Sequence, residues 1–340
     1  MVDFQTIILE KAFAYYREHG FPYVAYTDGE LWEMMLRLTQ VRTHLEARQR
    51  GFLSSSQVTT TAEGALAGMH IPYQFHRHIW DSYAEGMCSP MQAFSDDVKL
   101  KKALRLAYEK TNTVAPHQLR NKLKIVSFTQ MCSNFRPAVA FNLMYEFLPK
   151  GGTVFDPCAG YGGRLTAALA HMLTGHCAGY ECTDPQPLTV RANKKLASFF
   201  TQSPKVLHHS TPIEETKIEH TDHSLAMTSP PYFRKEVYDT GASNHLQSRA
   251  RYGDYAEWRN VFLVALCAKM QKAVRRGSYV LINIQDVNIK GVKIPLVADT
   301  ISTAGKIGLR HVKTMDMGFA GFGKGLAKKK TEAVLVFQKT

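Results

Sequence analysis

From about residue 150 onward, short apolar runs alternate with longer stretches in which apolar residues recur at helical spacing. The apolar runs are Thr153–Phe155, Cys177–Tyr180, Lys205–His208, Leu225–Met227 and Tyr279–Ile284. Strands that alternate with helices along a chain are typical of a parallel sheet covered by helices on both faces. The pattern therefore predicts an α/β fold with a doubly wound, mostly parallel sheet.

A further helix and a last strand are expected between residue 255 and the end of the printed sequence. A helix is expected over Tyr255–Arg276, because Trp258, Phe262, Leu266 and Met270 repeat at helical spacing and form a core stripe. The last apolar run, Glu332–Phe337, is expected to be an antiparallel strand at the edge of the sheet.

The first 130 residues have a different pattern. Apolar residues recur every three or four positions in Ile7–Tyr16, Leu31–Leu45 and Val98–Tyr108, which predicts helices. A polar, low-complexity link, Phe52–Thr61, lies between them and is interpreted as a surface connection. At 340 residues the chain has room for about two domains. We expect a helical N-terminal domain over residues 1–130 and an α/β domain over 131–340.

A glycine-rich loop follows the first predicted strand of the α/β part. The sequence from Val154 to Leu165 indicates a strand, a loop and then a helix. Glycines in such a loop allow positive φ angles and the close approach of a ligand to the backbone. The spacing is neither the dinucleotide fingerprint nor a P-loop. Glu181 follows about one βα unit later, where a carboxylate can accept hydrogen bonds from ribose hydroxyls, so an adenosine-containing ligand without a pyrophosphate is expected.

The second motif is Thr228-Ser229-Pro230-Pro231-Tyr232-Phe233, which follows the apolar run Leu225–Met227. The two prolines restrict the backbone and hold the carbonyl group of Pro230 in place. The Ser229 hydroxyl and this carbonyl could accept hydrogen bonds from an amino group, and Tyr232 or Phe233 could stack on a base. The simpler alternative is a Pro-Pro turn after a strand.

The two motifs together carry a family resemblance. The run Asp156–Gly163 resembles the first cofactor motif of S-adenosylmethionine-dependent amino-methyltransferases that act on DNA, and Thr228–Tyr232 resembles their catalytic motif. In that family Ser-Pro-Pro-Tyr is similar to the cytosine-N4 enzymes, whereas Asp/Asn-Pro-Pro-Tyr is usual for adenine N6. Ser133–Pro137 lies where the family has a segment that packs on the methionine end of the cofactor. The series also resembles a group of phage and bacterial methylase-like proteins, and the likeness covers roughly residues 131–340.

The resemblance implies a class I methyltransferase fold, S-adenosylmethionine as cofactor and direct in-line transfer of the methyl group without a metal. The catalytic residues that it implies are Ser229, Pro230, Pro231 and Tyr232. The cofactor-binding residues that it implies are Asn134, Phe135, Arg136, Asp156, Cys158, Ala159, Gly160, Gly162, Glu181 and Thr228. Here the cofactor loop precedes the catalytic motif, whereas many cytosine-N4 enzymes have the reverse order, so motif order does not choose the base.

The charge distribution indicates a polyanionic partner, and we expect DNA. The net charge is +13; residues 1–100 contain eight basic and twelve acidic side chains, and residues 101–130 contain seven basic side chains and one acidic one. The surplus positive charge therefore lies in the part that holds the motifs, as expected for a protein that neutralises phosphates. Two parts of the chain are candidates for target recognition: the helical N-terminal domain over residues 1–130 and the insertion Arg234–Gly253. The residues predicted to bind nucleic acid are Phe233, Arg234, Lys235, Arg249, Arg251, Lys122, Lys124, Lys328 and Lys329.

Other features are expected to be structural. His70, His76 and His78 lack Cys or carboxylate partners at zinc-site spacing, so no metal site is predicted. The six cysteines are scattered, as is typical of reduced thiols in a cytoplasmic protein. Neither a signal peptide nor an apolar run of membrane-spanning length is recognised, and a cytoplasmic location without membrane contact is expected.

Three alternatives remain open. The target base could be adenine at N6, or the substrate could be RNA, for example guanine N2 in tRNA, where related motifs have Asp-Pro-Pro-Tyr. From a different class, the chain could be a module that binds the cofactor without turnover and acts through protein or nucleic-acid contacts.

Overall fold

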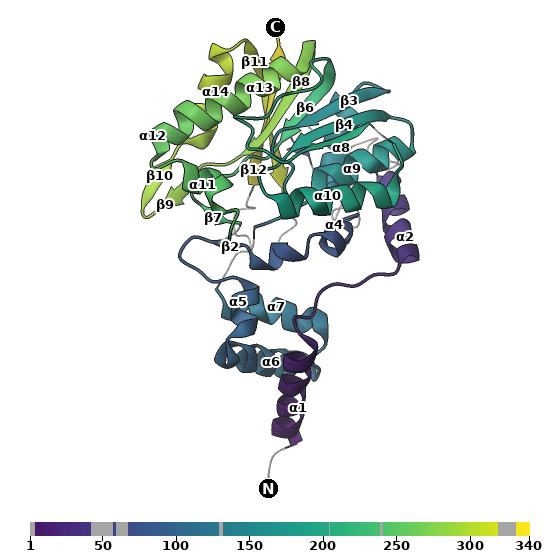
Figure 1. The fold of residues 1–340 in the computed structure, drawn as a ribbon, viewed down its shortest axis with the longest axis vertical. Helices are drawn as coiled ribbons and strands as arrows, with labels where there is room; N and C mark the ends of the chain where they lie inside the picture. Colours follow the sequence, from purple (N-terminus) through teal and green to yellow (C-terminus); the bar gives the residue numbers. More distant parts are fainter. Residues whose placement is uncertain are drawn as a thin grey trace. The chain divides into compact units, whose positions relative to one another are not determined.

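The computed structural model describes residues 4–41, 57–58, 67–128, 132–203, 205–238, 241–318 and 331–340 (Figure 1). These residues form two compact units. Unit 1 comprises residues 1–26, 77–133 and 235–241, and unit 2 comprises residues 27–76, 134–234 and 242–340. Residues 27–76 thus belong with the α/β part and not with the helical part, which differs from a single boundary near residue 130.

Unit 1 is helical. Its helices are α1 (Phe4–His19), η1 (Arg77–Asp81), α5 (Pro90–Ser95), α6 (Asp97–Thr111) and α7 (Pro116–Val126). The short strands β2 (Tyr83–Ala84) and β7 (Glu236–Val237) pair in it, so part of the predicted 234–253 insertion belongs to unit 1. Leu100, Leu104, Leu119 and Leu123 pack its interior, on the faces of α6 and α7 that their three- and four-residue spacing predicts.

Unit 2 is built on a sheet of eight described strands in the order β1-β11-β12-β8-β6-β3-β4-β5. The strands are β1 (Gln57–Val58), β3 (Gly152–Asp156), β4 (Cys177–Thr183), β5 (Val206–His209), β6 (His223–Thr228), β8 (Val274–Ile284), β11 (Leu309–Gly318) and β12 (Thr331–Lys339). A hairpin of β9 (Val287–Ile289) and β10 (Val292–Ile294) follows β8. Of the predicted polar link 52–61, only Gln57 and Val58 are described; they pair with β11, and the rest lies outside the described residues.

Strands β5, β4, β3, β6 and β8 are parallel to one another, and β12 runs antiparallel to β8. The predicted fold class is therefore confirmed: a doubly wound, mostly parallel sheet with an antiparallel last strand. The predicted position of that strand is wrong, because β12 lies between β8 and β11 and not at the edge. Strand β11 was not predicted, because its polar and apolar residues alternate and leave no continuous apolar run.

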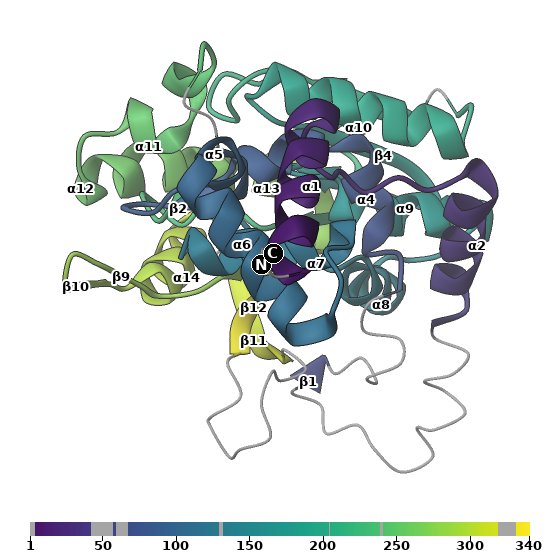
Figure 2. The ribbon, with the colours of Figure 1, turned by 90° about the horizontal axis from the view of Figure 1, so that it is seen from below.

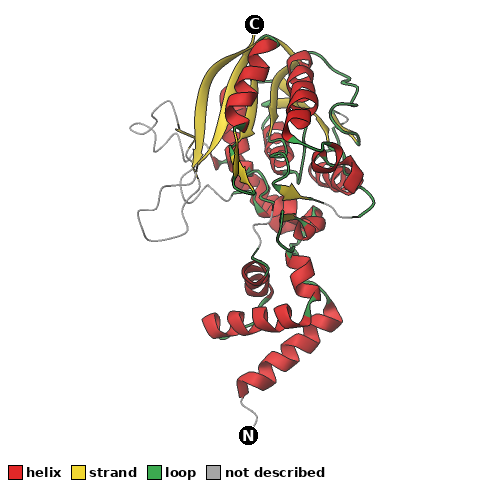
Figure 3. Ribbon diagram, turned by 90° about the vertical axis from the view of Figure 1, so that its left-hand side faces the viewer, coloured by secondary structure: helices red, strands yellow, loops and turns green. Residues whose placement is uncertain are grey.

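Helices cover both faces of this sheet (Figure 3). The helices of unit 2 are α2 (Asp28–Thr39), α4 (His70–Phe75), α8 (Pro137–Phe147), α9 (Gly163–Leu173), α10 (Pro187–Phe200), η2 (Asn244–Leu246), α11 (Ser248–Arg251), α12 (Tyr255–Trp258), η3 (Arg259–Leu263), α13 (Val264–Ala273) and α14 (Leu296–Lys306). The helix predicted over Tyr255–Arg276 is divided into α12, a π-helical segment η3 and α13, and it ends three residues early because β8 begins at Val274.

The core between the sheet and α13 contains the predicted stripe. Trp258, Phe262, Leu266 and Met270 are buried there with Phe155 of β3 and Ile282 of β8. In Figures 1 and 2 the β9–β10 hairpin, α11 and α12 lie on one side of unit 2, and α2 lies on the opposite side. Among the described residues, no helix combines the length and apolar character that crossing a membrane requires.

The strand order changes direction next to β3, because β4 and β5 follow on one side of it and β6 and β8 on the other. In open α/β sheets, ligands bind beyond the carboxyl ends of the strands at such a switch point. The two strands that meet there, β3 and β6, end in Asp156 and Thr228. The glycine loop and the Ser-Pro-Pro-Tyr corner therefore emerge side by side.

Candidate active site

The carboxylate of Asp156 connects the two motifs at the switch point. It is fully buried and accepts hydrogen bonds from Arg164 Nε at 2.7 Å, Tyr180 Oη at 2.6 Å and Thr228 Oγ1 at 2.9 Å. The backbone N–H of Cys158 adds a fourth bond at 3.2 Å. These partners come from β4, β6, α9 and the glycine loop, so one carboxylate fixes all four elements.

Arg164 is the cation of this group. Its Nη2 donates to Asp156 Oδ1 at 3.2 Å and also to the carbonyl of Cys158. Burial lowers the pKa of the guanidinium, but the Asp156 carboxylate, with Tyr180 and Cys158, raises this pKa by more, so the net shift is upward. Removing one partner of a buried ion pair costs about 3–5 kcal/mol. Asp156 was predicted to bind the cofactor; in this structure it accepts five hydrogen bonds from groups of the protein itself.

The segment that begins at Asn134 clamps the glycine loop. The Asn134 side chain donates to the Tyr161 carbonyl at 2.9 Å and accepts from the Gly163 N–H at 3.2 Å. A Cβ atom at Gly163 would lie 1.9 Å from the carbonyl oxygen of Phe135, so only glycine fits there. The ring of Phe135 lies 5.3 Å from the Arg164 guanidinium carbon. Asn134 and Phe135, both predicted cofactor residues, thus hold the loop in shape, and Arg136 is half-buried beside them.

Gly160 faces open space, unlike Gly162 and Gly163. Its φ is +55°, and the nearest atom that an added Cβ would meet is the Cys158 carbonyl oxygen at 3.9 Å. At Gly162, by contrast, a Cβ would come within 3.0 Å of Leu196, Asn193 and His76. Among these three glycines, Gly160 is therefore the one at which the backbone is open to a ligand.

Two side chains fix the peptide groups of Gly160. Asn193 Nδ2 donates to its carbonyl at 3.0 Å, and the Asn193 oxygen lies 3.0 Å from His76 Nε2. On the other side, the Gly160 N–H donates to Asp184 Oδ2 at 2.9 Å. His76, for which only a structural role was expected from the sequence, thus belongs to the support of the glycine loop.

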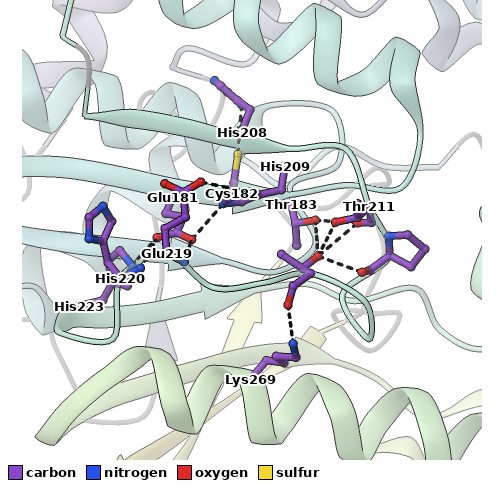
Figure 4. A network of polar contacts seen from close by, with 12 residues as sticks. Glu181, Cys182, Thr183, His208, His209, Thr211, Glu219, His220, His223 and Lys269 are labelled. Carbon is purple, nitrogen blue, oxygen red and sulfur yellow. Dashed lines mark hydrogen bonds and ion pairs between the residues drawn. The ribbon is translucent and has the colours of Figure 1, made fainter.

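Glu181 lies in a polar network that Figure 4 shows from close by. Its carboxylate is 1% exposed, and its oxygens lie 3.0 Å from His209 Nε2 and 3.1 Å from His223 Nε2. The backbone N–H groups of Glu219 and His220 donate to it at 3.1 and 3.3 Å. A carboxylate offers about four acceptor positions, so Glu181, predicted to hold a ribose, already has a full set of protein donors.

Asp184 is the acidic residue at the carboxyl end of β4. It is partly exposed, and within the described part of the chain its hydrogen-bond donors are the backbone N–H groups of Gly160 and Gln186, both at 2.9 Å. Burial raises its pKa to about 6, although these two bonds lower it. Each carboxylate oxygen therefore keeps acceptor capacity beside the open glycine. Asp184 was not among the predicted residues, because the strand was expected to end at Glu181, although Pro185 after Asp184 signals the strand end.

The Ser-Pro-Pro-Tyr corner begins directly after β6. Ser229 Oγ donates to Asn283 Oδ1 at 3.2 Å, and Tyr232 Oη donates to the same oxygen at 3.4 Å. No donor among the described residues binds the carbonyl of Pro230. Tyr232 is 6% exposed and packs in the core, so its ring presents little surface for stacking in this structure.

Phe233 lies in a strained turn. Its N–H donates to the Pro231 carbonyl at 3.0 Å, and its φ is +56°, a left-handed conformation that costs a residue with a Cβ about 1–2 kcal/mol. The ring packs on Tyr255 and Trp258, with centroids 5.5 and 6.0 Å apart. Predicted from the sequence to contact nucleic acid, Phe233 is a core residue that holds the corner against α12.

The basic residues predicted to bind nucleic acid lie in several places. Arg251 forms ion pairs with Glu214 and Glu215, and Lys124 lies 5.0 Å from the centroid of the Trp80 ring. Arg234 donates to the Gly253 carbonyl at 3.2 Å. Of the remaining basic residues predicted to bind nucleic acid, Lys122, Lys235 and Arg249 are partly buried. Lys328 and Lys329 lie outside the described residues.

The two thiols nearest the site have raised pKa values. Burial raises the pKa of Cys158 and Cys182, and the Asp156 carboxylate raises both further. All six cysteines are unpaired. In the part of the chain that is described, no group of three or more His, Cys, Asp or Glu residues could hold a metal ion.

Comparison with known proteins adds little. No protein-family model and no curated protein matches the sequence. Among the solved structures that are similar to this chain is a TehB-like SAM-dependent methyltransferase from Corynebacterium glutamicum, with 15% sequence identity over 61% of this chain and 90% of that one and a TM-score of 0.37. Another is a putative S-adenosylmethionine-dependent methyltransferase from Listeria monocytogenes, with 12% identity over 59% of this chain and 98% of that one and a TM-score of 0.39. The tRNA (m1A58) methyltransferase TrmI from Aquifex aeolicus is also similar, with 9% identity over 61% of this chain and 70% of that one and a TM-score of 0.40. At these values no conclusion about activity follows.

The Glu181 network should make stability depend on pH. Hydrogen bonding to Glu181 raises the pKa of His209. Although burial raises the pKa of Glu181, its bonds to His209 and His223 lower it below the usual range. The contribution of His209 is therefore complete below its unfolded pKa of about 6.5 and is lost as pH rises through the folded value, while that of Glu181 is lost only in acid.

We expect Glu181→Gln to lower the free energy of unfolding by about 2–4 kcal/mol at pH 6, and by less at pH 8. Urea unfolding at both pH values measures this. Glu219→Gln is the control, because that side chain is exposed and lies 4.0 Å from His209 Nδ1; it should change stability by less than about 1 kcal/mol. An equal loss for Glu181→Gln at both pH values would contradict the charged network.

Proposed function

We propose that this protein transfers a methyl group from S-adenosylmethionine to an exocyclic amino group of a DNA base, with cytosine N4 as the target. The observation that carries the proposal is the bond from Thr228 Oγ1 to Asp156 Oδ1, which joins the glycine loop to the Ser-Pro-Pro-Tyr corner at the switch point of the sheet. A ligand in the loop and a base at the corner would thus meet.

The residues around Gly160 suit an adenosine-containing cofactor. Gly160 is open on the side where a Cβ would lie, and Asp184 beside it keeps acceptor capacity on both oxygens. We assign the ribose hydroxyls to Asp184, because Glu181 has four protein donors already. When bound, S-adenosylmethionine supplies a methyl group that is activated by its sulfonium. The protein therefore needs to position the acceptor and not to activate the donor.

The corner supplies what an amino acceptor requires. The nitrogen of an exocyclic amino group is a weak nucleophile, since its lone pair is delocalised into the ring. The Ser229 hydroxyl and the Pro230 carbonyl would accept its two hydrogens and localise the lone pair. Pro231 holds the Pro230 carbonyl in place. Because these acceptors are fixed before the base arrives, they stabilise the charge that develops on the nitrogen.

The choice of DNA and of cytosine rests on two features of the sequence. The net charge is +13, which favours a phosphate backbone as partner. Ser229 stands where the resemblance favours cytosine N4 over adenine N6. In unit 2 the exposed cations Arg191, Lys194 and Lys195 of α10 add to the residues predicted from the sequence.

The reaction is tested with labelled S-adenosylmethionine and DNA or tRNA as acceptor, followed by nucleoside analysis. We expect label in N4-methylcytosine from DNA, and a rate about 100-fold lower for Ser229→Ala, which removes one of two fixed acceptors. Ser224→Ala is the matched control, since Ser224 is buried on the same strand, β6, at the opposite end from the corner.

Each other result selects an alternative. Label in N6-methyladenine contradicts the base assignment, and label in tRNA alone contradicts DNA as substrate. A protein that binds the cofactor and methylates neither acceptor is a binding module.

The cofactor contact is tested with Asp184→Asn. Hydrogen bonds to a carboxylate contribute about 1.5–3 kcal/mol, so the variant should bind S-adenosylmethionine about 10- to 100-fold more weakly. The pKa of Asp184 is raised to about 6 by burial. Wild-type affinity should therefore fall as pH drops below 6, whereas that of the variant should stay level. Calorimetric titration at pH 5 and 8 measures both. If Glu181→Gln lowers the affinity for S-adenosylmethionine and Asp184→Asn does not, Glu181 and not Asp184 binds the ribose hydroxyls.

A further inference from the structure

Asn283 of β8 controls the hydroxyl groups of the catalytic corner. Its amide nitrogen donates to the Ala333 carbonyl of β12 at 3.0 Å. This bond fixes which end of the amide is oxygen, because the Ala333 carbonyl accepts only from the NH₂ group. The amide oxygen then faces the corner, where Ser229 and Tyr232 both donate to it. The side chain is 3% exposed and lies in the otherwise apolar run from Val280 to Ile284.

The direction of the Ser229 bond matters for the chemistry. A hydroxyl carries one hydrogen and two lone pairs, and it donates or accepts according to where that hydrogen points. A hydrogen aimed at the substrate nitrogen would occupy the lone pair that must attack the methyl group. A hydrogen committed to Asn283 leaves the lone pairs of Ser229 as acceptors for the amino hydrogens.

The second bond, from Tyr232, supports the same arrangement. Two hydroxyl donors fill both lone pairs of the Asn283 oxygen. The bonds of 3.2 and 3.4 Å are long, as is common before a substrate tightens the site. The chain of bonds runs from the β12 backbone through β8 to the end of β6. Antiparallel strand β12 thus has a part in the active corner without reaching it.

We infer that Asn283 is a positioning residue that holds the Ser229 hydroxyl as a hydrogen-bond acceptor for the target amino group. The inference rests on the proposed function. Asn283 does not touch the substrate; it acts through Ser229.

The test compares Asn283→Leu with Asn283→Asp in the methylation assay. Leu removes the acceptor at similar volume, so kcat should fall about 100-fold while the KM for S-adenosylmethionine changes less than about threefold. Asp retains an oxygen that accepts from both hydroxyls, and its turnover should stay within about tenfold of wild type. Asp loses the donor to Ala333, so a purely structural role would make this variant at least as impaired as Leu.

Two further variants complete the test. Gln285→Leu is the matched control: Gln285 accepts from the N–H of the same residue, Ala333, at 3.3 Å without touching the corner, and its kcat should match wild type. In a Ser229→Ala background, Asn283→Leu should slow the reaction by less than about threefold, because the group through which it acts is gone.

Full activity of Asn283→Leu, equal losses in the Leu and Asp variants, or additive losses with Ser229→Ala would each overturn the inference. If Asn283→Leu does not fold, the turnover of Asn283→Asp decides alone: a loss of about 100-fold overturns it. A wild-type protein that transfers no methyl group overturns the proposed function instead.

Discussion

The buried carboxylate of Asp156 is the interaction on which the site depends. A charge in the protein interior must be compensated, and Asp156 is compensated by Arg164 and by the hydroxyls of Tyr180 and Thr228. Because these partners lie on different elements, satisfying one charge fixes the distance between the glycine loop and the Ser-Pro-Pro-Tyr corner. Two motifs that are 72 residues apart at this bond become a single site.

Around this centre the same principle recurs: polar side chains hold backbone and hydroxyl groups in one arrangement before any ligand binds. Asn134 and Asn193 fix the peptide groups of the glycine loop, and Asn283 fixes the hydroxyls of the corner. An amide suits this task because it donates and accepts at once, so each one bonds at least two groups. These groups are ordered when the protein folds and not when a ligand binds. The open side of Gly160 and the acceptor oxygens of Asp184 and Ser229 keep capacity for a ligand.

The sequence predicted the fold class, six strands of the sheet and both motifs, because apolar runs, glycines and prolines act locally. The sequence could not show on which face of the sheet a side chain lies. That face decides that the Glu181 carboxylate is surrounded by protein donors, whereas the Asp184 carboxylate keeps acceptor capacity. The sequence also indicated no pairing for Arg164, a lone cation at the start of an apolar helix, or for Asn283, a lone amide in an apolar strand. Each is a polar residue in an apolar context, which signals a buried partner without naming it.

The central claim is that cofactor and target base meet beyond the carboxyl ends of β3 and β6. A crystal structure of the protein with S-adenosylhomocysteine tests it most directly. The account predicts the nucleoside against Gly160, its ribose hydroxyls on Asp184, and its sulfur facing the Ser229 corner. A nucleoside bound elsewhere on the sheet, or no binding at millimolar concentration, would contradict it.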